Sequence, residues 1–147
     1  MAITFAQMCG AVKSHLETAA SLERSSNYDE MTEGMQDTPT LEVYPESSEP
    51  VSFGGTSQAW TVQSGVIQGS HTIHADLYAN QRSHLGEDMT AMVTGLDEVY
   101  TLLENAGCPP FGLEGIKSYQ FGWMRVLFKR GGVDYVGARF TIVLRTF

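Results

Sequence analysis

Apolar and polar positions alternate most regularly over the last twenty-five residues of the chain, from Trp123 to Phe147. A period of two sends successive side chains to opposite faces of a strand, so this segment predicts one long β-hairpin. Its predicted turn is Arg130-Gly131-Gly132, because paired glycines accept the positive φ angles of a tight turn. The return arm sorts into two faces: Val136, Ala138, Phe140, Ile142 and Leu144 on one, and Tyr135, Arg139, Thr141 and Arg145 on the other.

The first arm of the hairpin begins near Ile116 and changes its pattern around Gly122. Apolar residues before and after this glycine fall on opposite faces of an ideal strand. We therefore expect a bulge or bend at Gly122, because one extra residue would change which face is buried. The two sets are Tyr119, Phe121 and Trp123 on one face, and Met124, Val126 and Phe128 on the other.

Two segments have the spacing of three to four residues that is typical of amphipathic helices. The first runs from Thr4, a predicted N-cap, to about Ser25. The second runs from about Ser83 to Asn105 and is terminated by Gly107. Their apolar stripes are Phe5, Met8, Cys9, Val12, Leu16, Ala19 and Ala20 in the first, and Leu85, Met89, Met92, Val93, Leu96, Val99, Tyr100 and Leu103 in the second.

The middle of the chain predicts three shorter strands. Pro45 is expected to end the first of them, which begins at Thr40, because proline has no backbone N–H to donate to a neighbouring strand. A bulge is predicted at Ser64-Gly65 and a turn at Gly69-Ser70, where glycines interrupt the apolar pattern. The three strands run from Thr40 to Tyr44, from Gln58 to Gln68 and from His71 to Ala79.

The polar segments 26–38 and 46–57 are predicted to be extended loops within a single domain that covers residues 1–147. The predicted order is helix, strand, hairpin, helix, hairpin. This order favours an α+β fold of two layers, with a mostly antiparallel sheet and both helices packed on one of its faces. The C-terminal β-hairpin would form one side of that sheet.

Charge is unevenly distributed along the chain. The net charge is −8 and the pI is about 4.8, which argues against a groove that grips nucleic-acid phosphates. Nine of the seventeen acidic residues lie between Glu17 and Glu49, where Arg24 is the only base, and seven of the nine bases lie from Arg82 onward. Subunits that stack head to tail would use such polarity, although most surface charge is simply solvated.

Cys9 and Cys108 are the two cysteines, too few for a disulfide framework, and we expect both to be reduced. The N-terminus has no basic segment before its apolar stretch, which Gln7 and Lys13 interrupt, so we expect no signal peptide. No apolar run approaches the length of a membrane span. We expect a soluble protein that is made in the cytoplasm and does not bind a membrane.

His71-Thr-Ile-His74-Ala-Asp76 is the cluster whose residue types could ligate a metal ion. On a strand, His74 and Asp76 lie on one face and His71 points to the other. A zinc site requires three or four converging ligands, so another, such as His84, would have to come from elsewhere. The alternative is a set of polar residues on a solvated or interfacial face. We expect no catalytic, cofactor-binding or metal-binding residue.

Two groups of residues are candidates for an interface between subunits. The first is basic and lies on the C-terminal hairpin; it could also bind nucleic acid or simply keep a sheet edge soluble. The second lies in the acidic loop, where exposed apolar side chains would become ordered on a partner, the alternative being a mobile loop. The residues are Arg125, Lys129, Arg130, Arg139 and Arg145 in the first group, and Tyr28, Met31 and Met35 in the second.

The chain resembles tail terminator and related neck proteins of long-tailed bacteriophages. The similarity covers the amphipathic first helix and most of the domain, and it consists of loosely patterned segments rather than an active-site signature. The acidic loop and the Glu46–Ser57 insertion fall outside it. The similar segments are Leu41-Glu-Val-Tyr-Pro45, His74 to Arg82, Leu85-Gly-Glu-Asp-Met89, Trp123 to Ile142, and within the last of these Tyr135 to Ala138.

This resemblance implies a small α+β domain that forms a ring, commonly a hexamer, at the head-proximal end of the phage tail. The ring would be a structural part of the virion, would terminate the tail tube and would join it to the neck. Its expected partners are further copies of itself, the tail tube protein and a neck or connector protein. Phage DNA would pass through the bore without specific binding.

Two other functions remain open from the sequence. The first is a tail-tube or head-completion protein of the same lineage. The second is a metal-dependent enzyme that uses His74 and Asp76.

Overall fold

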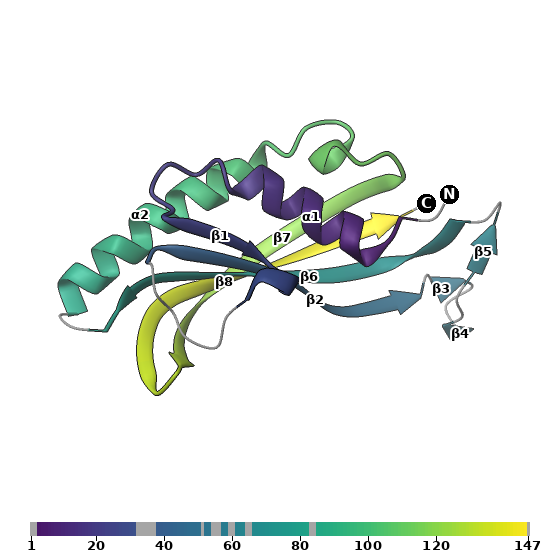
Figure 1. Cartoon of the computed structure of the whole chain (residues 1–147). Coiled ribbons are helices and arrows are strands. Elements are labelled where there is room, and N and C mark those ends of the chain that lie inside the picture. The colour runs from purple at the N-terminus through teal and green to yellow at the C-terminus, as the bar shows by residue number, and fades with distance from the viewer. Residues whose placement is uncertain are drawn as a thin grey trace.

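A computed structural model of the chain describes residues 3–31, 38–50, 52–53, 57–58, 61–63, 66–82 and 85–146. The fold is α+β, as predicted. Within the described residues, α1 (Phe5–Leu16) and α2 (Leu85–Glu104) lie on the same face of a twisted sheet (Figure 1). The main strands follow the spatial order β1 (Arg24–Asn27), β2 (Thr40–Pro50), β6 (Val66–Gln81), β8 (Val133–Thr146) and β7 (Ile116–Arg130).

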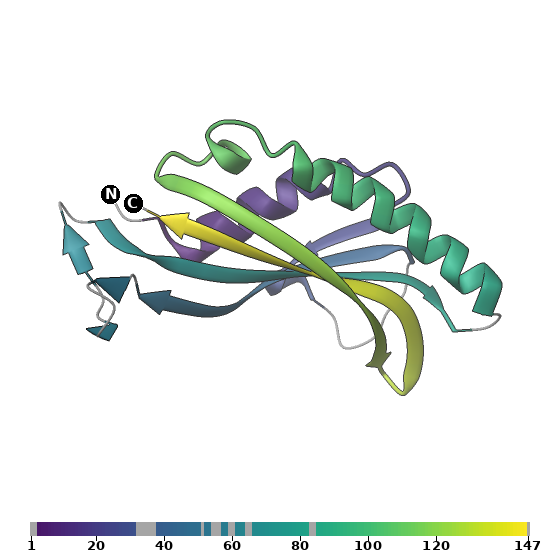
Figure 2. The same cartoon turned by 180° about the vertical axis from the view of Figure 1, so that it is seen from behind.

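The sheet is mixed. β1 pairs with β2 in parallel, and the other three neighbouring pairs are antiparallel. The far ends of β2 and β6 extend beyond the helices, where short strands accompany them (Figure 2). These are β3 (Ser52–Phe53), which pairs with β4 (Ser57–Gln58), and β5 (Thr61–Gln63), which pairs with β6. Two 3-10 turns, at Tyr28–Glu30 and Pro110–Gly112, complete the described elements.

The first helix begins where it was predicted and ends earlier. The Thr4 hydroxyl accepts a hydrogen bond from the Gln7 backbone N–H, and the Gln7 side chain accepts one from the Thr4 N–H, which forms a capping box. The helix ends at Leu16, so the prediction of a helix to Ser25 is wrong. Residues from Arg24 instead pair in parallel with β2, and this pairing outweighs the local spacing.

The second helix agrees with its prediction apart from its first turn. It runs from Leu85 to Glu104, and Gly107 follows with a φ of 88°. The predicted cap Ser83 lies outside the described residues. Two members of its predicted stripe, Val93 and Tyr100, are exposed rather than buried.

Two predicted strand ends are wrong, for different reasons. β2 continues past Pro45 to Pro50, because the register shifts between Pro45 and Ser47 and this irregularity accommodates a residue without an N–H. β6 runs without a turn through Gly69 and Ser70, which pair with β2 and in part with β8. The predicted bulge at Ser64-Gly65 lies outside the described residues.

The two predicted loops contain regular structure. Ser26 and Asn27 belong to β1 and residues 28–30 form a 3-10 turn, while residues 32–37 lie outside the described part of the chain. In the second segment, residues 46–50 belong to β2, and Ser52–Phe53 form β3. Polar composition here reflects strands that face solvent rather than an absence of strands.

The C-terminal hairpin forms with the predicted turn and the predicted faces. Arg130 pairs with Val133, and the two glycines between them have φ angles of 58° and 77°. A bulge or bend was predicted at Gly122, but the register is continuous from Ser118 to Arg130, so there is no bulge at that position. The pattern changes there because the buried face changes. Phe121 packs under α2, whereas Phe128 packs on the opposite side of the sheet.

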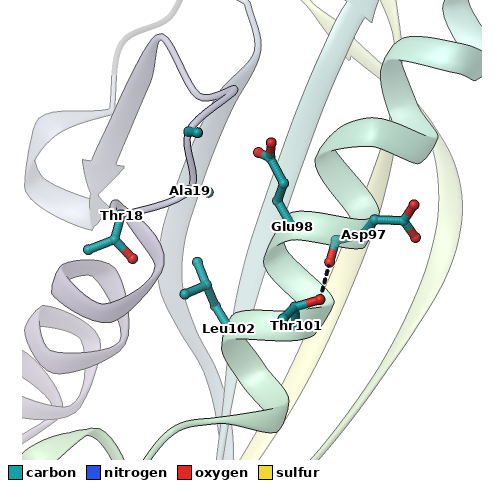
Figure 3. Close-up of a pocket in the computed structure, with 7 residues that line it drawn as sticks. Thr18, Ala19, Asp97, Glu98, Thr101 and Leu102 are labelled. Atoms are coloured by element: carbon teal, nitrogen blue, oxygen red, sulfur yellow. Dashed lines mark hydrogen bonds between the residues drawn. The ribbon is translucent and has the colours of Figure 1, made fainter.

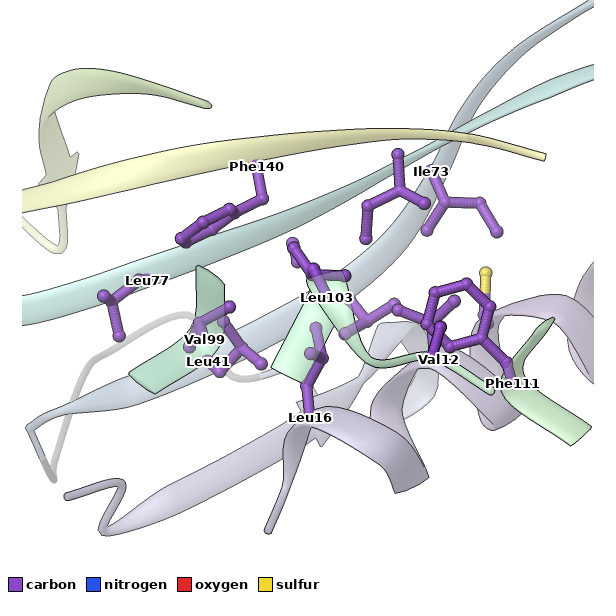
Figure 4. Close-up of a cluster of buried hydrophobic side chains, with 14 of the residues drawn as sticks. Val12, Leu16, Leu41, Ile73, Leu77, Val99, Leu103, Phe111 and Phe140 are labelled. Atoms are coloured by element: carbon purple, nitrogen blue, oxygen red, sulfur yellow. The ribbon is translucent and has the colours of Figure 1, made fainter. Parts of the chain in front are cut away.

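The main core lies between the helices and the sheet (Figure 4). Leu16 from α1 and Leu103 from α2 meet Phe140 from β8 within it, and all three side chains are fully buried. Truncating such a side chain to alanine costs about 3–5 kcal/mol, because it removes apolar contacts and leaves a cavity. This core fixes α1 and α2 on one face of the sheet, and no helix of the described chain covers the other face.

Candidate interaction surface

The face of the sheet opposite the helices, here called the open face, carries two buried carboxylates. Glu42 on β2 and Asp76 on β6 are each only 3% exposed. They are sheltered because the turn end of the β7–β8 hairpin curls toward this face (Figures 1 and 2). A buried carboxylate requires a paired cation and hydrogen bonds, and both are present here.

Arg130 supplies the partner for Glu42. Its Nη1 and Nη2 atoms donate to Oε1 and Oε2 of that carboxylate, the second bond at 3.1 Å. Nη1 also donates to the Tyr78 hydroxyl at 3.2 Å. These hydrogen bonds to the carboxylate and to the hydroxyl raise the pKa of Arg130. The turn end of the hairpin is thereby fixed to β2.

An aromatic cluster supports the same end of the hairpin. The rings of Tyr78 and Phe128 are stacked with centroids 4.4 Å apart, and Tyr135 meets Tyr78 edge-on at 5.9 Å. All three residues are buried on the open face. This second apolar cluster explains why the first arm of the hairpin changes its buried face after Gly122.

Arg139 is bound in the same manner to Asp76. Its Nε and Nη2 atoms donate to the two carboxylate oxygens at 2.8 and 3.2 Å. The Tyr44 hydroxyl donates to Asp76 Oδ2 at 2.7 Å. Burial, together with this hydrogen bond, raises the pKa of Tyr44, and the bonds to Asp76 raise the pKa of Arg139. The guanidinium also lies over the Phe128 ring, 5.7 Å from its centroid.

These pairs change the interpretation of the basic hairpin. Arg130 and Arg139 pair with acidic residues of their own chain, so much of the predicted charge complementarity is satisfied inside one subunit. The other three basic candidates, Arg125, Lys129 and Arg145, are exposed. Their contact with a neighbouring subunit stays a prediction.

The candidates in the acidic loop are described only in part. Tyr28 is 42% exposed and Met31 is 38% exposed. Met35 lies outside the described residues. The structure therefore places two apolar side chains at the surface just after β1.

The histidine cluster does not form a metal site with the residues described. His74 and Asp76 share the open face, as predicted, but both oxygens of Asp76 are bound by Arg139. His74 Nδ1 lies 3.3 Å from the Thr141 hydroxyl, and its Nε2 lies 3.7 Å from Glu46. In the described parts of the chain, no three His, Cys, Asp or Glu side chains gather closely enough to hold a metal ion.

The remaining histidines are either engaged elsewhere or undescribed. His71 projects to the helix side, where its Nδ1 lies 2.8 Å from the Ser48 hydroxyl and its ring meets Phe5. Burial lowers the pKa of His71, which favours its neutral form. His84, the other suggested ligand, lies outside the described residues.

The most prominent exposed surface lies on β7, which is an edge strand of the main sheet. Trp123, Met124 and Leu127 are 45%, 59% and 54% exposed. The alternation of β7 predicts opposite strand faces for Trp123 and Met124 but does not indicate that both are exposed. The main core ends at Phe121, so the helix side of β7 is uncovered at Trp123 and Leu127, whereas Met124 lies on the open face beside Arg139.

The neighbouring side of α2 extends this exposed surface. The rings of Tyr100 and Phe121 meet at 5.2 Å, and Arg125 Nη1 lies 3.7 Å from Met89 Sδ. Val93 of α2 and Trp123 of β7 lie between these two contacts along their elements, and both are exposed. Exposed apolar side chains therefore continue from the strand edge onto the adjacent side of the helix.

The two elements that form this surface carry opposite charge. α2 contains five acidic residues and no base, whereas β7 contains four bases and no acid.

None of the described helices is both long enough and apolar enough to cross a lipid bilayer. In comparisons with known proteins, no protein-family model matches the chain, and neither does any curated protein.

Proposed function

We propose that this chain is a structural, non-enzymatic subunit that assembles into a homo-oligomeric ring of a phage tail. The ring would lie at the head-proximal end, terminate the tail tube and join it to the neck. The observation that carries this proposal is the outer edge of β7, where Trp123, Met124 and Leu127 are exposed together. The resemblance of residues Trp123 to Ile142 to tail terminator and neck proteins supplies the biological setting.

An exposed edge of this kind is a liability in a free monomer. β7 is 15 residues long and lies at the end of the strand order, so its outer backbone groups have no strand partner within the described chain. Such edges recruit further chains unless they are short, heavily charged or covered. A single exposed apolar residue is ordinary, but here Trp123 and Leu127 on the helix side and Met124 on the open face leave apolar side chains exposed on both sides of one edge strand, a feature of the kind that marks interaction sites.

A ring covers this edge in every copy. Closed homo-oligomers bury one patch of each subunit against another, and no copy is left with an open edge. The fold suits this role, because α1 and α2 lie on one face of the sheet (Figure 2) and α2 contacts β7 through the rings of Tyr100 and Phe121. The finer architecture proposed here is two-layered, with a mostly antiparallel sheet and a long C-terminal hairpin.

The charge of the chain supports the proposed setting in the virion. Six copies, the number common in that family, would carry about −48 charges in total. DNA would be repelled by a bore of that sign and would pass through without specific binding. The proposed partners are the tail tube protein on one side of the ring and a neck or connector protein on the other.

The mass of the purified full-length chain tests this proposal. We expect size-exclusion chromatography with light scattering to give a fixed multiple of 16.1 kDa, and negative-stain images to show rings. Assembly should also shift Trp123 fluorescence to shorter wavelength, because the indole loses contact with water. A protein that stays monomeric at every concentration would refute the proposal, and tubes of indefinite length would favour the tail-tube alternative.

A further inference from the structure

A groove lies between the turn that follows α1 and the middle of α2 (Figure 3). It is a wide, open depression with a volume of about 380 Å³. The lining is mostly apolar, with two carboxylates from α2. The residues are Thr18, Ala19 and Ala20 from the turn and Asp97, Glu98, Thr101 and Leu102 from α2.

One wall of the groove is held in place by a side chain from the opposite wall. Glu98 Oε2 accepts hydrogen bonds from the backbone N–H, at 2.9 Å, and from the hydroxyl of Ser21. This contact ties the turn after α1 to α2, so the groove is formed before any partner arrives. Asp97, one position earlier, is exposed at the rim.

We infer that this groove receives the β7 edge of a second copy of the chain. The inserted element is the stripe formed by Trp123, Arg125 and Leu127, which share the helix side of β7 because they alternate along one strand. The stripe spans roughly 14 Å, since a strand rises about 3.4 Å per residue. The inference rests on the proposed function and specifies how neighbouring subunits of the ring would meet.

The chemistry of the two surfaces is complementary. The stripe presents apolar, basic and apolar side chains in succession, all of them exposed. The groove presents a mostly apolar lining. The Glu98 carboxylate binds Ser21 across the groove, and the Asp97 carboxylate points away from the turn after α1, at the outer side of α2 (Figure 3). Trp123 and Leu127 would be buried against the apolar lining, and Arg125 would meet the acidic surface that these two residues give α2. Tryptophan and arginine are the side chains that most often dominate the energy of protein interfaces.

Charge argues against the other two ways of covering β7. Pairing β7 with β7 of another copy would bring together two strands that each carry four bases and no acid. Pairing β7 with β1, at the other edge of the sheet, would match fifteen residues with four. β1 also begins with the cation Arg24. Of the three surfaces compared, β7, β1 and α2, the one on α2 is acidic, with five acidic residues and no base.

The positions of the stripe and the groove suit a closed ring. The groove lies beside α1, which packs on β1 and β2, and the stripe lies on β7, at the opposite edge of the sheet. One subunit can therefore offer its stripe to one neighbour and its groove to the other. A contact between two different patches closes into a ring when its rotation permits.

Complementation between two assembly-deficient variants of the full-length chain tests the inference. Leu127→Glu places a carboxylate in the stripe and leaves the groove intact. Ala20→Trp fills the groove at an exposed position and leaves the stripe intact. Each variant alone should be monomeric by light scattering. An equimolar mixture should give a dimer of one copy of each, because a single intact contact remains.

Matched controls separate this contact from general damage. Ser14→Trp adds the same side chain at an exposed position of α1 outside the groove, and it should assemble as the wild type does. Asp97→Lys reverses the charge of the rim without filling the groove. It should raise the protein concentration needed for ring assembly at least tenfold. All variants should keep the near-UV circular dichroism of the wild type.

The outcomes distinguish the inference from the proposed function. A wild-type chain that is monomeric would refute both. Wild-type rings that persist in Ala20→Trp and in Asp97→Lys would overturn the inference alone, because the β7 edge would then meet another surface. Two monomeric variants that fail to form a mixed dimer would also overturn it, since they would point to a symmetric contact.

Discussion

The guanidinium of Arg130 forms a bidentate ion pair with Glu42, a residue 88 positions earlier in the chain. β6 and β8 separate the strands that carry the two residues. The pair can form only because the turn end of the hairpin curls over the open face (Figure 1). One side chain therefore joins the turn end of the hairpin to β2, a strand with which neither arm of the hairpin pairs.

Arg130→Met should lower the free energy of unfolding by roughly 3 kcal/mol, because it leaves the Glu42 carboxylate buried without its cation. The double variant Arg130→Met with Glu42→Met should recover most of this loss, since two apolar side chains can replace a buried ion pair. Urea unfolding of the four proteins of this cycle measures both effects. A double variant as unstable as the single one would indicate that the pair does more than neutralise a buried carboxylate.

Arg139→Glu should destabilise the subunit itself. The sequence placed Arg139 in the basic group that would contact a neighbouring subunit. The structure pairs Arg139 with Asp76. The substitution would place a second carboxylate beside the buried carboxylate of Asp76, and it should lower the free energy of unfolding by about 3–5 kcal/mol. Arg145→Glu, at an exposed position of the same strand, should change stability by less than about 0.5 kcal/mol. Thermal unfolding of the two variants checks this contrast.

The fold was predictable wherever one face of an element was buried throughout its length. β8 is such an element: Phe140, Ile142 and Leu144 all enter one core, and the period of two is unbroken. Prediction failed where burial changes along an element. At Gly122 the buried face changes from one side of β7 to the other, and a pattern of this kind looks like a bulge when it is interpreted one strand at a time.

The sequence predicted the hairpin that carries the basic residues, but not the environment of their side chains. It could not show that Arg130 and Arg139 pair with acidic residues 88 and 63 positions earlier. It also could not show that Trp123 and Leu127 stay exposed, because apolar residues on a strand predict burial by default. Exposure of such residues depends on where the helices end, which is a property of the packed fold.

Gly137, the one glycine of β8, should not tolerate even a methyl side chain. A methyl group there would overlap the Leu77 carbonyl oxygen and lie 2.8 Å from Phe128 Cε2, and backbone cannot move away cheaply. Gly137→Ala should therefore cost roughly 3 kcal/mol, at the upper end for overpacking. Gly122→Ala is the matched control on β7, where nothing lies within 4 Å, and it should stabilise by about 0.5 kcal/mol. Denaturant midpoints that shift equally for both variants would contradict the close approach of β6 and β8.

The thiol of Cys9 should make the subunit less stable at alkaline pH. Burial raises the pKa of this thiol from 9.0 to about 11, because the folded interior disfavours the thiolate. The unfolded chain therefore releases this proton first. The stabilisation is complete below about pH 9 and is lost as the pH rises toward 11.

Between pH 8 and pH 10 the loss due to Cys9 should be about 1 kcal/mol. Urea unfolding across this interval measures it, with Cys9→Ala expected to reduce the slope and Cys108→Ala, at an exposed cysteine, expected to leave it unchanged. The interval stops at pH 10 because the raised pKa values of Tyr44 and Tyr78 act in the same direction above it. Identical slopes in the wild type and Cys9→Ala would show that the thiol does not stay protonated in the core.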